Sequence, residues 1–188
     1  MTDFCCESVV TNAYICRRIV CGGMFKLIVK LKYNNEMIEV GQYLPENLGN
    51  DLDGNEVKSS DFAGKPMIIY FYPKDNTPGC TAEACSIQED YSRLREKGYV
   101  VIGISKDSPA SHKKFADKYG LQFLLLSDES TFVNQAFGVW QKKKMAGREY
   151  MGTVRTTFIT DAEHKVIEII RKVDTKNAGR QLMETIGK

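Results

Sequence analysis

Two cysteines set five positions apart are the residues of this sequence best suited to chemistry. Cys80 and Cys85 follow an apolar stretch that ends at Tyr72, and they open a segment rich in helix-forming residues. A thiol near a helix N-terminus faces unpaired backbone N–H groups and the positive end of the helix dipole, which favour its thiolate. Because the thiolate is the nucleophilic form of cysteine, we predict redox or nucleophilic chemistry at this pair.

The residues just before Cys80 support this prediction. Thr77 can cap the helix, Pro78 suits its first turn, and Gly79 allows a ligand to approach the backbone closely. A buried, inert thiol is therefore a poor interpretation of Cys80, whereas Cys85 considered alone could equally be a small core residue.

The spacing of the pair predicts a structural change on oxidation. Five residues of an ideal helix rise about 7.5 Å and turn about 140°, which separates the two Cα atoms by roughly 8 to 9 Å. A disulfide spans less than about 7 Å between Cα atoms. A bond between Cys80 and Cys85 therefore requires the first turns of the helix to unwind.

The composition is that of one folded domain preceded by a segment of a different kind. The chain has 188 residues, of which 43% are hydrophobic, and a net charge of +2, which is ordinary for a single domain. Residues 1–35 hold four of the six cysteines and five basic residues against two acidic ones. We predict that 1–35 is an extension outside the domain, with Met24 and Met37 as alternative starts that would make it a misassigned leader, and that 36–188 is the domain.

Charge and cysteine patterns exclude several classes of function. Beyond residue 35 there are 21 basic and 22 acidic residues, so no basic face for nucleic acid is expected, and the run 142–144 is interpreted as a solvated loop without a function. No apolar run is long enough to span a membrane, and Asp3 and Glu7 argue against a secretory signal. The cysteine-poor domain indicates a reducing compartment, the cytoplasm, and the early cysteines match no usual zinc spacing.

Apolar runs and helix signals alternate through the domain. Strands are predicted at 67–72, 99–105, 123–126, 154–160 and 166–170, and helices at 78–97, 108–119, 131–137 and 174–187. The run 67–72 is apolar throughout, so it is expected to be central, and Asp53-Gly54 predicts the turn of an entry hairpin. Parallel βαβ units followed by an antiparallel hairpin predict an α/β, thioredoxin-like fold with a mixed central sheet and helices on both faces.

Several spaced motifs resemble the peroxiredoxin family. The pattern Pro73-x3-Thr77-x2-Cys80 is similar to the peroxiredoxin active-site signature, and Thr77-Pro-Gly-Cys-Thr81 followed by Ala84-Cys85 resembles the bacterioferritin comigratory protein, or peroxiredoxin Q, branch. Further segments similar to that branch are 70–74, 101–105, 127–129, 137–140 and 155–158. The resemblance extends from about Met37 to the end of the chain.

The resemblance implies a role for each residue of the site. Cys80 would be the peroxidatic thiol, which attacks the O–O bond of hydrogen peroxide or an organic hydroperoxide and becomes a sulfenic acid, and Cys85 would be the resolving thiol. Thr77 would place its hydroxyl against the thiolate and the peroxide, Pro73 would shield the pocket, and Arg155 would supply a permanent positive charge. The resemblance also implies thioredoxin as the reductant, a monomeric protein, and no organic cofactor or metal.

Other polar residues near these motifs are given no catalytic role. Glu83, one turn after Cys80, is interpreted as an acid that favours the helix dipole. His112 and His164 fall at a predicted helix start and in a turn, and we expect them to be solvent-exposed bystanders. Trp140 is expected to pack rather than to contact substrate.

Two alternatives remain open. A thioredoxin-like thiol-disulfide oxidoreductase would share the fold, but it needs two cysteines separated by two residues, and the domain has only Cys80 and Cys85. A non-enzymatic thiol sensor or a metal-binding module could use the pair as a switch or as ligands, although two thiolates alone make an incomplete zinc site. Catalytic peroxide consumption distinguishes a peroxidase from both alternatives.

Overall fold

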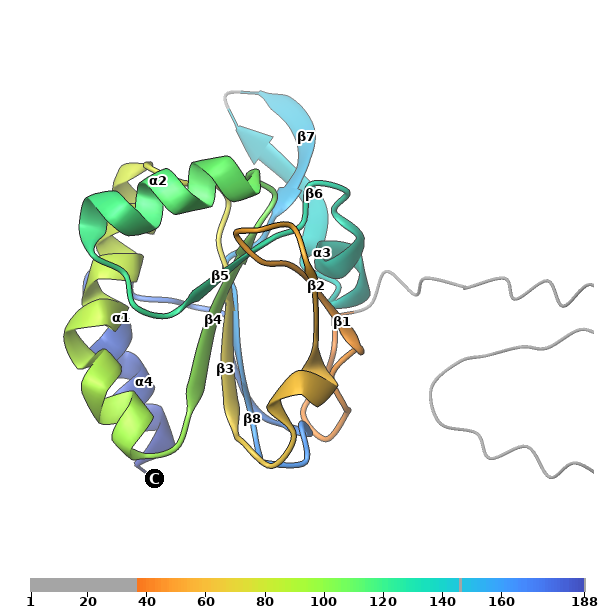
Figure 1. The fold of residues 1–188 in the computed structure, drawn as a ribbon. Coiled ribbons are helices and arrows are strands. Elements are labelled where there is room, and N and C mark those ends of the chain that lie inside the picture. The colour runs from red at the N-terminus through yellow and green to blue at the C-terminus, as the bar shows by residue number, and fades with distance from the viewer. Residues whose placement is uncertain (1–36, 146, 188) are drawn as a thin grey trace, which may run out of the picture. The chain divides into compact units, whose positions relative to one another are not determined.

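The computed structural model describes residues 37–145 and 147–187. The predicted extension 1–35 and its four cysteines lie outside the described residues. The described chain contains a seven-stranded sheet, a separate two-stranded hairpin and four α-helices (Figure 1).

The strands of the main sheet are β1 (Asn47–Asn50), β2 (Glu56–Lys58), β3 (Met67–Phe71), β4 (Val100–Ser105), β5 (Leu124–Ser127), β8 (Thr156–Thr160) and β9 (Val166–Ile170). The separate hairpin is formed by β6 (Trp140–Met145) and β7 (Arg148–Thr153). The helices are α1 (Pro78–Glu96), α2 (Pro109–Tyr119), α3 (Phe132–Ala136) and α4 (Ala178–Ile186), together with the short 3-10 helix η1 (Ser59–Phe62). The predicted elements are all found, with boundaries that shift by a few residues.

β3 lies at the centre of the sheet, as its apolar run predicts. The strand order is β2-β1-β5-β4-β3-β8-β9, in which β3 pairs in parallel with β4 and antiparallel with β8. All five residues of β3 are buried, because helices cover both faces of the sheet. The mixed thioredoxin-like sheet is therefore confirmed, and so is the entry hairpin, in which β1 pairs antiparallel with β2.

Two apolar layers hold the helices on the sheet. Ile68 and Tyr70 of β3 face the layer that contains α1, α2 and α4, whereas Ile69 and Phe71 face the layer that contains α3. Figure 1 shows α1 and α4 side by side on the first face and α3 on the other. Each large apolar side chain buried in these layers contributes roughly 1.5 to 3 kcal/mol to the stability of the fold by removing apolar surface from water. Several such contacts hold α1 on the sheet.

The crossing of α1 and α4 is unusually close. The amide of Gly179 in α4 donates to Ser86 Oγ of α1 at 3.2 Å, and a Cβ at position 179 would lie 2.2 Å from the Ser86 carbonyl oxygen. Only glycine permits this approach, so α4 packs backbone against backbone on the residue that follows Cys85.

Among the four α-helices, only α2 has a side-chain hydrogen bond at its N-cap. The Ser108 hydroxyl accepts a hydrogen bond from the Ser111 amide at the start of α2. Thr77 is the N-cap of α1, but its side chain makes no capping bond, so that part of the prediction is wrong. Its hydroxyl donates instead to the Lys74 carbonyl at 3.1 Å, within the turn that leads from β3 to α1.

The lysine run 142–144 is a strand, and its interpretation as a loop is wrong. It belongs to β6, whose register with β7 pairs Lys142 with Met151 and Lys143 with Tyr150. An ion pair between Lys142 and Glu149, 2.7 Å, joins the two strands, and Lys143 Nζ donates to the Thr153 carbonyl at 2.9 Å. Polar cross-strand contacts of this kind leave no apolar alternation from which a strand could be predicted.

Candidate active site

Cys80 lies in the first turn of α1 and is almost completely buried. Its side chain is 2% exposed and packs in the apolar layer beside Tyr70 and Tyr72. Cys85 lies further along the same unbroken helix and is half-buried, and both thiols are free. Burial, followed by the charge of Glu89, raises the pKa of Cys85 above its ordinary value. The two residues thus lie in one helix, as the sequence predicted, but the burial of Cys80 in the apolar layer differs from the expectation, which rejected a core position for this residue.

Arg155 connects the thiol to a buried carboxylate. It lies between β7 and β8, where the Val154 amide donates to the Val139 carbonyl at 2.8 Å and fixes the chain. Arg155 Nη2 donates to Cys80 Sγ at 3.2 Å, and Nη1 pairs with the Glu83 carboxylate. Burial acts to lower the pKa of Arg155, but Glu83 and Cys80 raise it. The guanidinium is therefore a fixed positive charge at the sulfur.

Glu83 is part of this site, and its interpretation as a simple dipole acid is wrong. Its side chain is completely buried, one oxygen accepts from Arg155, and the other, Oε1, has no hydrogen-bond partner among the described residues. Burial raises the pKa of Glu83 to about 7, although Arg155 acts in the opposite direction. The placement of Glu83 beside Cys80 could have been predicted from their spacing of three positions, because residues three apart share one face of a helix.

Thr77 and Pro73 lie in the turn that carries the chain into α1. Both are partly buried, and the Thr77 hydroxyl is directed to Lys74 by the bond described above. Asn76 within the same turn has a φ of 55°, in the left-handed region that residues other than glycine seldom adopt. The roles of Thr77 and Pro73 toward peroxide stay predictions.

The two histidines differ from each other and from the expectation of exposure. His112 is completely buried in α2, and its Nδ1 lies 3.0 Å from Asp75 Oδ2, so the expected exposure is wrong. His164 is half-buried at a turn with a φ of 63°, and its Nε2 lies 3.1 Å from the Phe62 carbonyl oxygen. Trp140 is half-buried at the start of β6.

Lys143 is a second cation close to the thiol that the sequence did not indicate. Its burial and the charge of Arg155 lower the pKa of Lys143, while the charge of Cys80 acts to raise it. Since Lys143 also binds the carbonyl of Thr153, two residues before Arg155, it supports the segment that presents the guanidinium. A basic residue in a lysine run gives no local signal of such a position.

No metal site or membrane span is found in the part of the chain that the structure describes. Within residues 37–145 and 147–187, no three His, Cys, Asp or Glu side chains lie close enough together to hold a metal ion. None of the described helices is long and apolar enough to cross a membrane. The groups that the structure brings together at the site are the Cys80 thiol, the Arg155 guanidinium and the Glu83 carboxyl group.

Comparisons with known proteins place this arrangement in a wider context. The sequence profile of the AhpC/TSA family matches residues 40–169. Peroxiredoxin Bcp of Bacillus subtilis is 44% identical over 149 residues, which cover 79% of this chain and 95% of that protein. Peroxiredoxin Bcp of Escherichia coli is 39% identical over 140 residues, covering 74% and 90%. The solved structure of Xanthomonas campestris bacterioferritin comigratory protein, which was studied for its alkyl peroxide reduction activity, matches with a TM-score of 0.72 at 30% identity, covering 79% and 98%.

Proposed function

Because this chain belongs to the AhpC/TSA family, in its bacterioferritin comigratory protein or peroxiredoxin Q branch, and is a thiol peroxidase, we propose that Cys80 is its peroxidatic thiol. The observation that supports this choice is the hydrogen bond of 3.2 Å from Arg155 Nη2 to Cys80 Sγ, at the N-terminus of α1. Arg155 thus places a permanent positive charge beside the sulfur, where it can stabilise negative charge in the reaction.

The first step is oxidation of Cys80 by hydrogen peroxide or an organic hydroperoxide. The thiolate attacks one peroxide oxygen, so an S–O bond forms while the O–O bond breaks, and the leaving oxygen takes up a proton and departs as water or an alcohol. Arg155 stabilises the negative charge that moves onto the leaving oxygen. Thr77 directs the peroxide with its hydroxyl, and Pro73 shields the pocket from water.

Cys85 is the resolving thiol in the second step. Its sulfur attacks the sulfenic acid of Cys80, an S–S bond forms, and the hydroxyl of the sulfenic acid leaves as water. Both residues lie in α1 in the reduced form, so the first turns of the helix unwind before the bond closes.

The cycle is completed by a dithiol reductant, which we assign to thioredoxin. Thiol-disulfide exchange returns Cys80 and Cys85 to thiols and leaves the reductant as a disulfide. We also assign the chain to the cytoplasm as a monomer; the low cysteine content of the domain agrees with a reducing compartment.

A steady-state peroxidase assay with thioredoxin, thioredoxin reductase and NADPH tests these assignments. The parent chain is compared with Cys80→Ser and Cys85→Ser, at equal concentrations of hydrogen peroxide and of a bulky alkyl hydroperoxide. We expect no turnover with Cys80→Ser, and a single turnover with accumulation of the sulfenic acid with Cys85→Ser. Full turnover of Cys80→Ser would refute the assignment of the peroxidatic thiol, and replacement of thioredoxin by glutaredoxin with no loss of rate would refute the reductant.

A further inference from the structure

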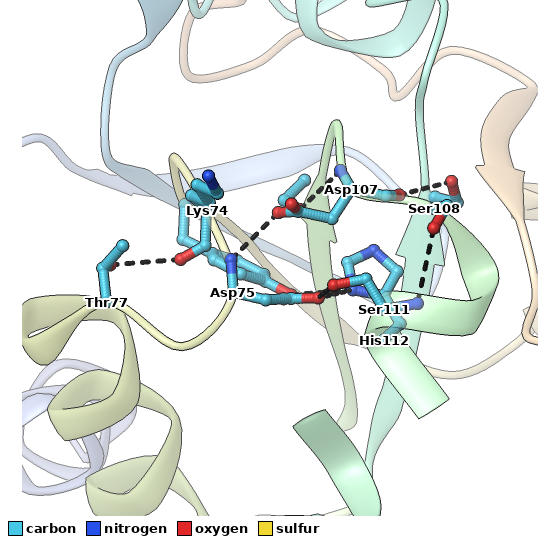
Figure 2. A network of polar contacts seen from close by, with 10 residues as sticks. Lys74, Asp75, Thr77, Asp107, Ser108, Ser111 and His112 are labelled. Carbon is cyan, nitrogen blue, oxygen red and sulfur yellow. Dashed lines mark hydrogen bonds and ion pairs between the residues drawn. The ribbon is translucent and has the colours of Figure 1, made fainter. Parts of the chain in front are cut away.

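The turn between β3 and α1 is attached to α2 by a buried carboxylate. Asp75 lies in this turn, its side chain is 2% exposed, and it belongs to neither the thiol site nor the apolar layers. Figure 2 shows Asp75 between Lys74 and the first turn of α2, with its carboxylate directed at Ser111 and His112. A buried charge is expensive, so a carboxylate placed here needs a structural or functional reason.

Three side chains donate hydrogen bonds to this carboxylate. The Tyr72 hydroxyl donates to Oδ1 at 2.8 Å, the Ser111 hydroxyl donates to Oδ2 at 2.7 Å, and His112 Nδ1 lies 3.0 Å from Oδ2. In addition, the backbone amide of Asp75 donates to Asp107 Oδ2 at 2.9 Å. Asp75 is therefore held through both its side chain and its backbone, by residues from α2 and from the segment that follows β4.

His112 is suited to holding Asp75 rather than to exchanging protons with solvent. It is completely buried, and its second nitrogen, Nε2, has no hydrogen-bond partner in the described part of the chain. Burial acts to raise the pKa of Asp75, but the hydrogen bonds from His112 and Ser111 hold this pKa below its ordinary value. The carboxylate is therefore charged. Hydrogen bonds to charged groups are about twice as strong as those between neutral groups.

The attachment of Asp75 determines the geometry of its neighbours on both sides. On one side, the carbonyl of Lys74 accepts the hydrogen bond from the Thr77 hydroxyl, as Figure 2 shows. On the other side, Asn76 is held at a φ of 55°. A residue other than glycine keeps such a conformation only where its surroundings enforce it.

We propose that Asp75 and His112 are positioning residues that keep the β3–α1 turn in the form that reacts with peroxide. The proposal rests on the proposed function, in which Thr77 directs the peroxide and the first turns of α1 unwind to form the disulfide. With the Asp75–His112 contact intact, Thr77 is oriented and α1 starts at Pro78. When the contact is lost, the turn relaxes, which disfavours the reaction with peroxide and favours the unwinding that leads to the disulfide.

Substitutions at His112 separate this role from a general loss of stability. His112→Leu fills the buried site and removes the donor, whereas His112→Asn keeps an N–H group near the place of Nδ1. Phe115→Leu is the matched control, because Phe115 is a buried residue of the same helix and belongs to the apolar layer. Ser111→Ala removes one donor from a partly exposed position and serves if His112→Leu does not fold.

Each variant is examined in single-turnover reactions with peroxide and by hydrogen exchange. Rapid mixing and acid quench, followed by mass spectrometry, give the rate constants for formation of the sulfenic acid and of the disulfide. We expect His112→Leu to slow the first step at least about tenfold, as loss of one charge-assisted hydrogen bond would do, without slowing the second. His112→Asn should recover most of the first rate, Ser111→Ala should lose less than His112→Leu, and Phe115→Leu should leave the ratio of the two rates unchanged.

Hydrogen exchange of residues 73–81 gives a readout that does not depend on activity. Exchange in this segment should be faster in His112→Leu than in His112→Asn and Phe115→Leu. The proposal is overturned if His112→Leu keeps the parent rates and exchange, or if Phe115→Leu changes the ratio of rates as much as His112→Leu does. Failure of the proposed function is a separate result, because the parent chain itself would then form no sulfenic acid on Cys80.

Discussion

Replacement of Glu83 tests how the buried acid of the site is charged. Burial raises the pKa of Glu83 from an ordinary value of 4.5 to about 7, so the folded chain keeps a proton that the unfolded chain releases between these values. Stability conferred by that proton is complete below about pH 4.5, is lost as the pH rises toward 7, and does not change further above 7. A rise in the pKa of Glu83 from 4.5 to about 7 corresponds to about 3 kcal/mol of unfolding free energy.

The experiment compares Cys80→Ser with the double variant Cys80→Ser, Glu83→Gln. Serine at position 80 removes the titration and oxidation of the thiol, and Gln does not titrate but can still accept a hydrogen bond from Arg155. Urea unfolding, followed by the fluorescence of Trp140, is measured from pH 4.5 to 8 at constant ionic strength. We expect the single variant to lose about 3 kcal/mol of unfolding free energy relative to the double variant over this range.

The direction in which this stability difference changes with pH shows whether burial or the ion pair with Arg155 dominates the pKa of Glu83. Burial favours the protonated form because Oε1 has no partner in the described structure, whereas Arg155 favours the carboxylate. A difference that does not vary with pH, or a gain in the relative stability of the Glu83 form as the pH rises, would refute the reasoning. In the first case the ion pair with Arg155 would balance the effect of burial on the pKa of Glu83, and in the second it would outweigh that effect.

Three further predictions concern other parts of the site and its support. Arg155→Lys should slow the reaction of Cys80 with peroxide by about 100-fold, as loss of a preorganised donor does, whereas the exposed control Arg148→Lys should not; stopped-flow kinetics measures both. Gly103→Ala should cost about 1 to 3 kcal/mol in urea unfolding, because its Cβ would lie 2.6 Å from the ring of Tyr70. Oxidation to the disulfide should increase hydrogen exchange in residues 78–85, and unchanged protection there would contradict the unwinding of α1.

The parts of the structure that depend on local signals were predictable from the sequence. The apolar run of β3 can only be buried on both faces, and Ser108, Pro109 and Gly120 mark the two ends of α2 by capping chemistry. The position of Cys80 at a helix start follows from the same kind of signal. These features require no knowledge of distant residues.

The contacts between distant partners were not predictable, although the resemblance placed Arg155 in the site and Glu83 shares a helix face with Cys80. Glu83 and Arg155 are 72 positions apart, and Asp75 and His112 are 37 apart. A polar residue taken alone is most simply placed in solvent, because burial is costly without a partner. Hydrogen-bonded pairs of this kind become recognisable only when the fold has brought their elements together.

The close crossing of α1 and α4 has a consequence for the energetics of turnover. Because Gly179 rests directly on the backbone of Ser86, melting of the helix from its N-terminal end meets a barrier one residue past Cys85. In the proposed cycle, formation of the Cys80–Cys85 disulfide would therefore disorder about two turns of α1 and leave the remainder as a template on which those turns re-form. Refolding after reduction then extends an existing helix, which avoids the slow nucleation of a new one.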